Sequence, residues 1–216
     1  MSLPAGNIAH VSIFFKLNIQ LPGLRSIFAG VENFSDLLGE KTVPQIVPGL
    51  AIGPPSIAIS QYKNTRIEYV GDRNLLRQSG PLIELIELNE ILPSLFEKQG
   101  YSLNELVRFC ELDTHYNPMM GKGVVDWIRS NVKVNLEGLS NVCNEELKPF
   151  SFWASNSDNP LTDKWLSIML QPDANSPHNR LLWRIIKRTE THGELSEFLK
   201  RVKTIKEELA RMFGAQ

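Results

Sequence analysis

Apolar and polar residues alternate along several short stretches of the chain, which is the pattern of a strand with one buried and one solvent-facing side. In residues 8–19 every second residue from Val11 to Ile19 is apolar, and only Phe14 breaks the alternation. Similar patterns predict further strands at residues 56–62, 65–70, 74–78, 105–116, 149–154, 165–170 and 180–188. Lys63-Asn64 separates two of these strands and suits a tight hairpin.

Apolar residues spaced three and four apart predict helices in other stretches. The predicted helices are residues 24–38, 81–96, 124–130 and 195–213. Pro81 favours a helix start, Gly100 favours a stop, and Pro93 either kinks the helix or marks a restart. Residues 41–55 contain four prolines and two glycines. This composition excludes a regular helix or a central strand, so we expect an ordered crossing loop there.

The two halves of the chain, residues 1–102 and 103–216, are predicted to contain elements in the same order. Each reads as a strand, a helix, two or three antiparallel strands and a long closing helix. The sequence therefore predicts an α+β fold, with an antiparallel sheet that has its helices packed on one face. It also predicts an internal duplication in which both halves share one continuous core, and an open sheet face that serves as the working surface.

This order of elements resembles doubled α+β arrangements such as the TATA-box-binding-protein-like and helix-grip folds. In addition, a hairpin, a kinked helix and a strand ending in Tyr116-Asn117 are similar to features of a sporadically distributed, uncharacterised prokaryotic family. The resemblance implies a prokaryotic protein and brings no known activity with it.

Composition narrows the class of protein. With 216 residues, 42% of them hydrophobic and 22% charged, the chain matches an ordinary globular protein. Its formal net charge of -1 gives no overall attraction to nucleic acid or membrane. No apolar stretch reaches the ~20 residues of a membrane helix, so we expect a cytoplasmic protein. Cys110 and Cys143 lack the spacing of a metal or redox motif and are expected to be reduced and buried.

Candidate chemistry is concentrated in residues 105–116. On a strand, Glu111, Asp113 and His115 point to the same side, with neighbours ~6.6 Å apart. They could hold a divalent metal or act as an acid-base pair, and the alternative is that they simply face solvent. The sequence has no phosphate-binding glycine loop, nucleophile elbow or zinc motif, and we predict no cofactor.

Aromatic and basic residues are concentrated on the last three predicted strands. The tryptophans there are Trp153, Trp165 and Trp183. They either pack in the core or line a groove for a ligand, a base or a peptide. Arg180, Arg184 and Arg188 make the same region basic, which indicates either a solvated face or contact with a nucleic-acid backbone.

The hypothesis that these patterns favour is a non-enzymatic binding or interaction protein that uses the open sheet face, and a homodimer is one form it could take. A protein or small-molecule partner is favoured over nucleic acid. Two alternatives stay open: a metal-assisted hydrolase that uses Glu111, Asp113 and His115, and a nucleic-acid-binding protein that uses the basic C-terminal region.

Overall fold

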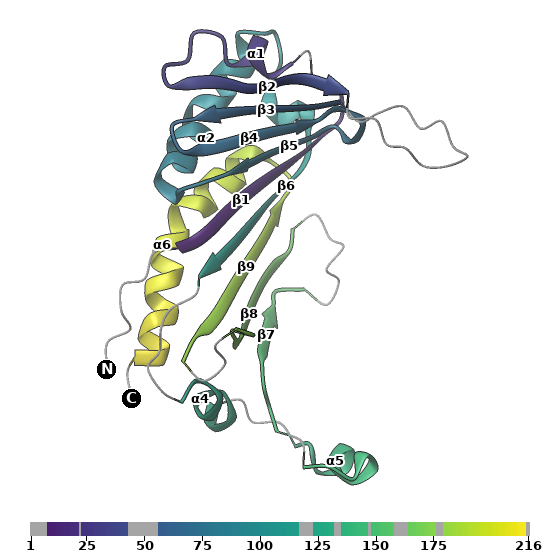
Figure 1. Ribbon diagram of the computed structural model, residues 1–216, viewed down its shortest axis with the longest axis vertical. Helices are drawn as coiled ribbons and strands as arrows, with labels where there is room; N and C mark the ends of the chain where they lie inside the picture. The colour runs from purple at the N-terminus through teal and green to yellow at the C-terminus, as the bar shows by residue number, and fades with distance from the viewer. Residues whose placement is uncertain are drawn as a thin grey trace, which may run out of the picture.

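The computed structural model describes residues 8–21, 23–42, 56–116, 123–131, 135–146, 148–157, 164–175 and 179–214. Its described strands form one antiparallel sheet in the order β2-β3-β4-β5-β1-β6-β9-β8-β7 (Figure 1). The strands are β1 (Ile8–Leu17), β2 (Phe34–Thr42), β3 (Ser56–Tyr62), β4 (Thr65–Val70), β5 (Leu75–Ser79), β6 (Val107–Tyr116), β7 (Phe152–Ser155), β8 (Leu166–Pro172) and β9 (Leu181–Thr189). The helices are α1 (Leu24–Ile27), α2 (Leu82–Glu97), α3 (Leu103–Leu106), α4 (Val124–Asn131), α5 (Glu137–Cys143) and α6 (His192–Gly214).

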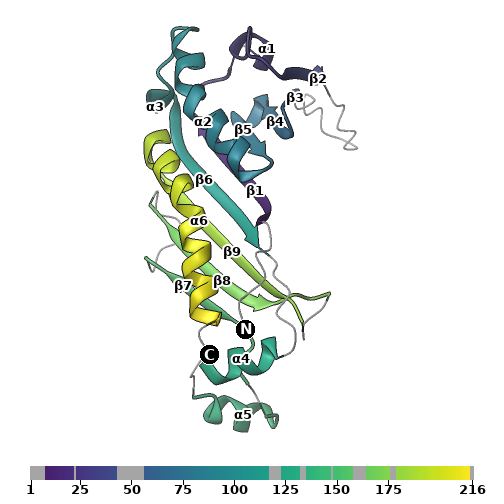
Figure 2. The ribbon, with the colours of Figure 1, turned by 90° about the vertical axis from the view of Figure 1, so that its left-hand side faces the viewer.

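The long helices α2 and α6 lie across one face of this sheet (Figure 2). The burial of the strands follows from that arrangement. In β6 every second side chain from Cys110 to Tyr116 is buried, and the side chains between them are only half-buried. The predicted α+β fold, an antiparallel sheet with helices on one face, is confirmed.

The main hydrophobic core contains residues from both halves of the chain. Phe15 of β1 and Leu92 of α2 belong to the same buried cluster as Leu112 of β6 and Leu199 of α6. A buried polar contact also crosses between the halves, because Asn89 of α2 lies 3.2 Å from the ring nitrogen of His192 in α6.

A second, smaller cluster lies under the strands of the second half. It contains Tyr116 and Trp183, whose rings meet edge to face at 5.3 Å, together with Val124 and Ile128 of α4. The predicted helix at 124–130 is thus confirmed.

The two halves follow a similar order around the central pair of strands. β1 and β6 are antiparallel neighbours, and in each half the last strand, β5 or β9, lies beside the first one. Each half then ends in a long helix, α2 or α6. The nine strands among the described residues belong to one sheet, and the division into two duplicated halves at residue 102 stays a prediction.

The expected helix at 24–38 is wrong. Helix α1 stops at Ile27, and strand β2 begins at Phe34. Between them Gly30 and Asn33 have positive φ angles of 78° and 61°, in the left-handed region that ends a helix. The apolar residues of this stretch therefore do not form one helical face. Two of them, Phe28 and Phe34, lie on either side of a turn, and their rings stack with centroids 4.8 Å apart.

Two other expectations need correction or lie beyond the described residues. Helix α5 forms between the predicted helix at 124–130 and the predicted strand at 149–154, where the apolar pattern is poorly defined, and none of its residues is buried. The reduced state of both cysteines agrees with the prediction, but only Cys110 is buried, whereas Cys143 on α5 is exposed. Residues 43–55 of the expected crossing loop and Asn117 lie outside the described residues.

Most of the remaining elements agree with the sequence patterns, but the first two residues of the predicted strand at 105–116 belong to helix α3. Lys63, with a φ of 51°, forms the tight turn of the β3-β4 hairpin, and α2 continues through Pro93. In the described parts of the chain, no helix has both the length and the apolar character needed to cross a membrane.

Candidate functional site

The side of the sheet opposite α2 and α6 carries the charged residues of β6. We call it the open face and define it by Phe109, Glu111, Asp113 and His115 together with their cross-strand neighbours. Each of these four side chains is half-buried, whereas the residues between them are buried beneath the helices. The predicted common side for Glu111, Asp113 and His115 is therefore also the side that meets solvent.

Both carboxylates of β6 are bound by arginines of the adjacent strand β9. Arg184 donates to Asp113 through Nε at 3.0 Å and Nη2 at 2.8 Å, which is a two-point contact. Arg188 donates to Oε2 of Glu111 from Nε at 3.0 Å and from Nη2 at 2.6 Å. The hydrogen bond to Asp113 raises the pKa of Arg184 above its usual value. The register of β6 against β9 holds these four side chains in two fixed ion pairs.

These ion pairs occupy the carboxylates that the sequence offers, together with His115, as ligands for a divalent metal. The His115 Nε2 lies 3.1 Å from Asp113, but the Asp113 carboxylate already accepts two hydrogen bonds from Arg184. A metal ion bound here would have to displace a guanidinium from each carboxylate. Among the described residues, no group of three or more His, Cys, Asp or Glu side chains is placed to hold a metal. The geometry therefore favours a structured charged surface over a metal centre.

A row of side chains runs across five strands at the end of the open face. We call it the Trp153 row. It consists of Trp153 on β7, Met169 on β8, Arg184 on β9, His115 on β6 and His10 on β1. Each member is the direct cross-strand partner of the next, so the side chains stand beside one another on the same face.

Trp153 is the most exposed large aromatic side chain in this row, with 64% of its surface accessible. Its indole Nε1 donates a hydrogen bond to the Ser167 hydroxyl, which fixes the orientation of the ring on the sheet. A tryptophan that is oriented in this way and still exposed leaves apolar area available to a partner.

At the other end of the Trp153 row, two histidines face each other. The ring centroids of His10 and His115 lie 6.1 Å apart. Burial lowers the pKa of His10, and the nearby His115 and Arg77 lower it further. His10 also bonds to the Ser12 hydroxyl at 2.7 Å. This end of the row is thus polar.

The other candidates from the sequence occupy different places. Trp183 is buried in the second core cluster, so its role is packing. Trp165 precedes β8 and donates to the Ser155 hydroxyl at 2.7 Å. Arg180 is exposed just before β9, apart from the two ion pairs.

The basic C-terminal region is not one surface. Arg184 and Arg188 lie on the open face and are bound to carboxylates, whereas Lys187 alternates with them and points to the helix side. On α6, Lys200 forms an ion pair with Glu90 at 3.3 Å. The positive charges are thus divided between two faces of the sheet, and several are neutralised.

Comparison with known proteins gives no match to a family model, to a curated protein or to a solved structure. The resemblances to a prokaryotic family and to doubled α+β folds stay predictions. The fold and the open face together define an α+β protein with a solvent-facing antiparallel sheet, and a function has to be argued from that surface.

Proposed function

We propose that this chain is a non-catalytic binding protein that docks another protein on its open sheet face, with the Trp153 row as the central contact. The observation that carries the proposal is the alignment of an exposed tryptophan, a methionine and an arginine in one cross-strand row. These three residue types are enriched in protein interfaces, and tryptophan and arginine dominate their binding energy.

The charges of the open face support a protein partner over nucleic acid. Glu111 and Asp113 neutralise Arg188 and Arg184, and Glu68 on β4 does the same for Arg66 at 2.6 Å. A surface of fixed, alternating charges suits a partner with complementary charges of both signs. A polyanion would instead meet arginines that are already paired with carboxylates, so these pairs offer no net positive charge to attract it.

A second copy of the chain is one candidate partner, which would make the protein a homodimer. β7 is a short edge strand of the sheet and carries exposed aromatic side chains on both faces, Phe152 and Trp153. An apolar edge strand without charged residues is suited to pairing with another strand. The two unpaired cysteines favour the reducing cytoplasm as the place where it acts.

The test compares variants of the tagged chain isolated under native conditions from cells that naturally produce it. We expect native mass spectrometry to find the unmodified chain in a complex with a second protein, or with its own copy, at fixed stoichiometry. Trp153→Ala and Arg184→Glu should each weaken this complex by at least ~30-fold, because each removes a central contact of the kind that costs ~2 kcal/mol or more.

Lys203→Glu is the control, because Lys203 is exposed on α6, on the other side of the sheet. It should leave the complex unchanged. The proposal is wrong if all variants give the same species, or if the bound material is removed by nuclease. Turnover of a small substrate that a single open-face substitution abolishes would also overturn the non-catalytic assignment.

A further inference from the structure

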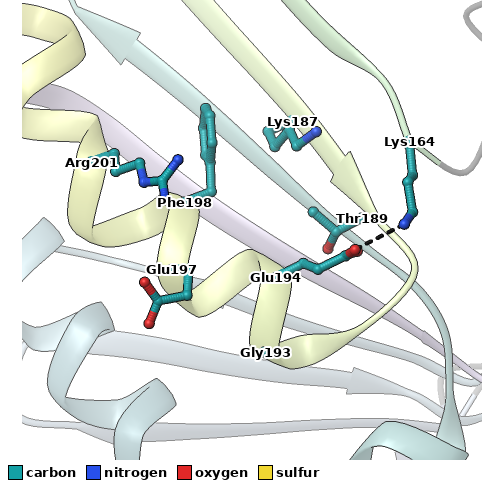
Figure 3. A pocket seen from close by; sticks show the side chains of 8 residues that line it. All are labelled: Lys164, Lys187, Thr189, Gly193, Glu194, Glu197, Phe198 and Arg201. Carbon is teal, nitrogen blue, oxygen red and sulfur yellow. Dashed lines mark hydrogen bonds and ion pairs between the residues drawn. The ribbon is translucent and has the colours of Figure 1, made fainter.

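A cavity of about 430 Å³ lies on the helix side of the sheet, away from the open face. It is open to solvent on one side and is lined by the first turns of α6, by β9 and by Lys164 before β8 (Figure 3). The residues that characterise it are Lys164, Lys187, Thr189, Glu194, Phe198 and Arg201. Its volume is in the range of pockets that hold small organic ligands.

Lys187 is the unusual residue of this cavity. On β9 the side chains of Leu181, Trp183 and Ile185 point toward the helices and are buried, and Lys187 is the next residue in that series. A lysine therefore stands where the alternation calls for an apolar residue. Burial lowers its pKa, so part of its hydration has been lost.

The described residues provide no ion pair for Lys187. Its Nζ lies 5.9 Å from the centroid of the Phe198 ring, which is a cation-π contact. The Glu194 carboxylate is close enough to favour the charged form of Lys187, but its direct hydrogen bond, at 2.9 Å, is to Lys164. A partly desolvated ammonium that no described carboxylate contacts directly leaves a position where an anion is favoured.

The surroundings of Lys187 indicate what else such a ligand contains. Figure 3 shows the Phe198 ring between Lys187 and Arg201, with the Glu197 carboxylate directed away from both cations. The cavity thus offers cationic groups beside an aromatic wall. This pairing suits a molecule with an oxyanion at one end and an apolar or aromatic body.

We propose that this cavity binds a small organic oxyanion, a carboxylate or a phosphate, whose charged group contacts Lys187 and whose apolar body packs on Phe198. The site is separate from the open face, because β9 directs Lys187 to the helix side and Arg184 and Arg188 to the other. A ligand here would contact the sheet and α6 at once.

The test uses the fluorescent probe anilinonaphthalene sulfonate, which joins an oxyanion to an aromatic body. We expect saturable binding of one probe per chain and displacement by phenyl phosphate or benzoate. Comparing these two competitors with inorganic phosphate distinguishes the preferred oxyanion from recognition of the charge alone. Neutral benzyl alcohol at the same concentration should not displace the probe, and this comparison needs no variant.

Lys187→Met keeps the apolar stem of the side chain and removes its charge, so it should weaken probe binding at least about tenfold, as expected for a charge-assisted contact. Lys203→Met is the matched control, since Lys203 is exposed and does not line the cavity. Equal probe affinity in both variants, or displacement by benzyl alcohol as effective as by phenyl phosphate, would overturn the proposal.

Discussion

Leu199→Asp should unfold the protein or leave it only marginally stable. Leu199 is 1% exposed and lies in the main core, where α6 packs against α2 and β6. The substitution places a carboxylate in apolar surroundings and removes a packed side chain, at a cost of ~4 kcal/mol or more. Because whole domains are stable by only ~5–15 kcal/mol, denaturant unfolding followed by circular dichroism should show most of the stability lost.

Two neighbouring positions on α6 serve as comparisons. Lys203→Asp, at an exposed position, should cost no more than ~1 kcal/mol. Phe198→Asp should have an intermediate effect, because Phe198 is half-buried at the cavity and an introduced carboxylate could approach Lys187. If Leu199→Asp is as stable as Lys203→Asp, then α6 does not pack on the sheet as described.

Acidification should destabilise the protein through His192. This side chain is 5% exposed, and burial lowers its pKa to about 4. An unfolded histidine has a pKa of about 6.5. Between about pH 6.5 and pH 4, the unfolded chain therefore binds a proton at His192 that the folded chain does not bind. The neutral ring therefore supports the fold fully above about pH 6.5, and this contribution of roughly 3 kcal/mol is lost as the pH falls toward 4.

His192→Gln removes this titration, so the free energy of unfolding should depend less on pH between 6.5 and 4 in the variant than in the unmodified chain. His10→Asn should change the slope less, because His10 is exposed, although its pKa is shifted in the same direction. Parallel pH profiles for the unmodified chain and His192→Gln would contradict a buried, neutral His192.

Elements with a regular apolar pattern could be predicted from the sequence. Burial of one side of a strand or helix repeats apolar residues at a fixed spacing, and a single exception does not hide that spacing. β1, α2, β6 and α6 have such a period, and their bounds differ from the predictions by a few residues. The structure of residues 24–38 could not be predicted in this way. Its apolar residues recur at helical spacing, but left-handed backbone at Gly30 and Asn33 is a local property that the period does not report.

Some features of the candidate site could likewise be predicted from the sequence, and others could not. That Glu111, Asp113 and His115 share a face follows from the strand period alone. Their partners do not, because the register of β6 against β1 and β9 is set by packing between segments far apart in the chain. The ion pairs with Arg184 and Arg188, and the place of His10 and Met169 in the Trp153 row, therefore required the structure.

Site-specific photo-crosslinking tests the role of the open face most directly. A benzoyl-phenylalanine residue is placed at position 153, 169 or 203 of the chain, in cells that naturally produce it. Irradiation should give one discrete protein adduct from positions 153 and 169 and none from position 203, and Arg184→Glu in the same chain should remove the adduct. Adducts of equal yield from all three positions, or an adduct from position 203 alone, would contradict docking on the open face.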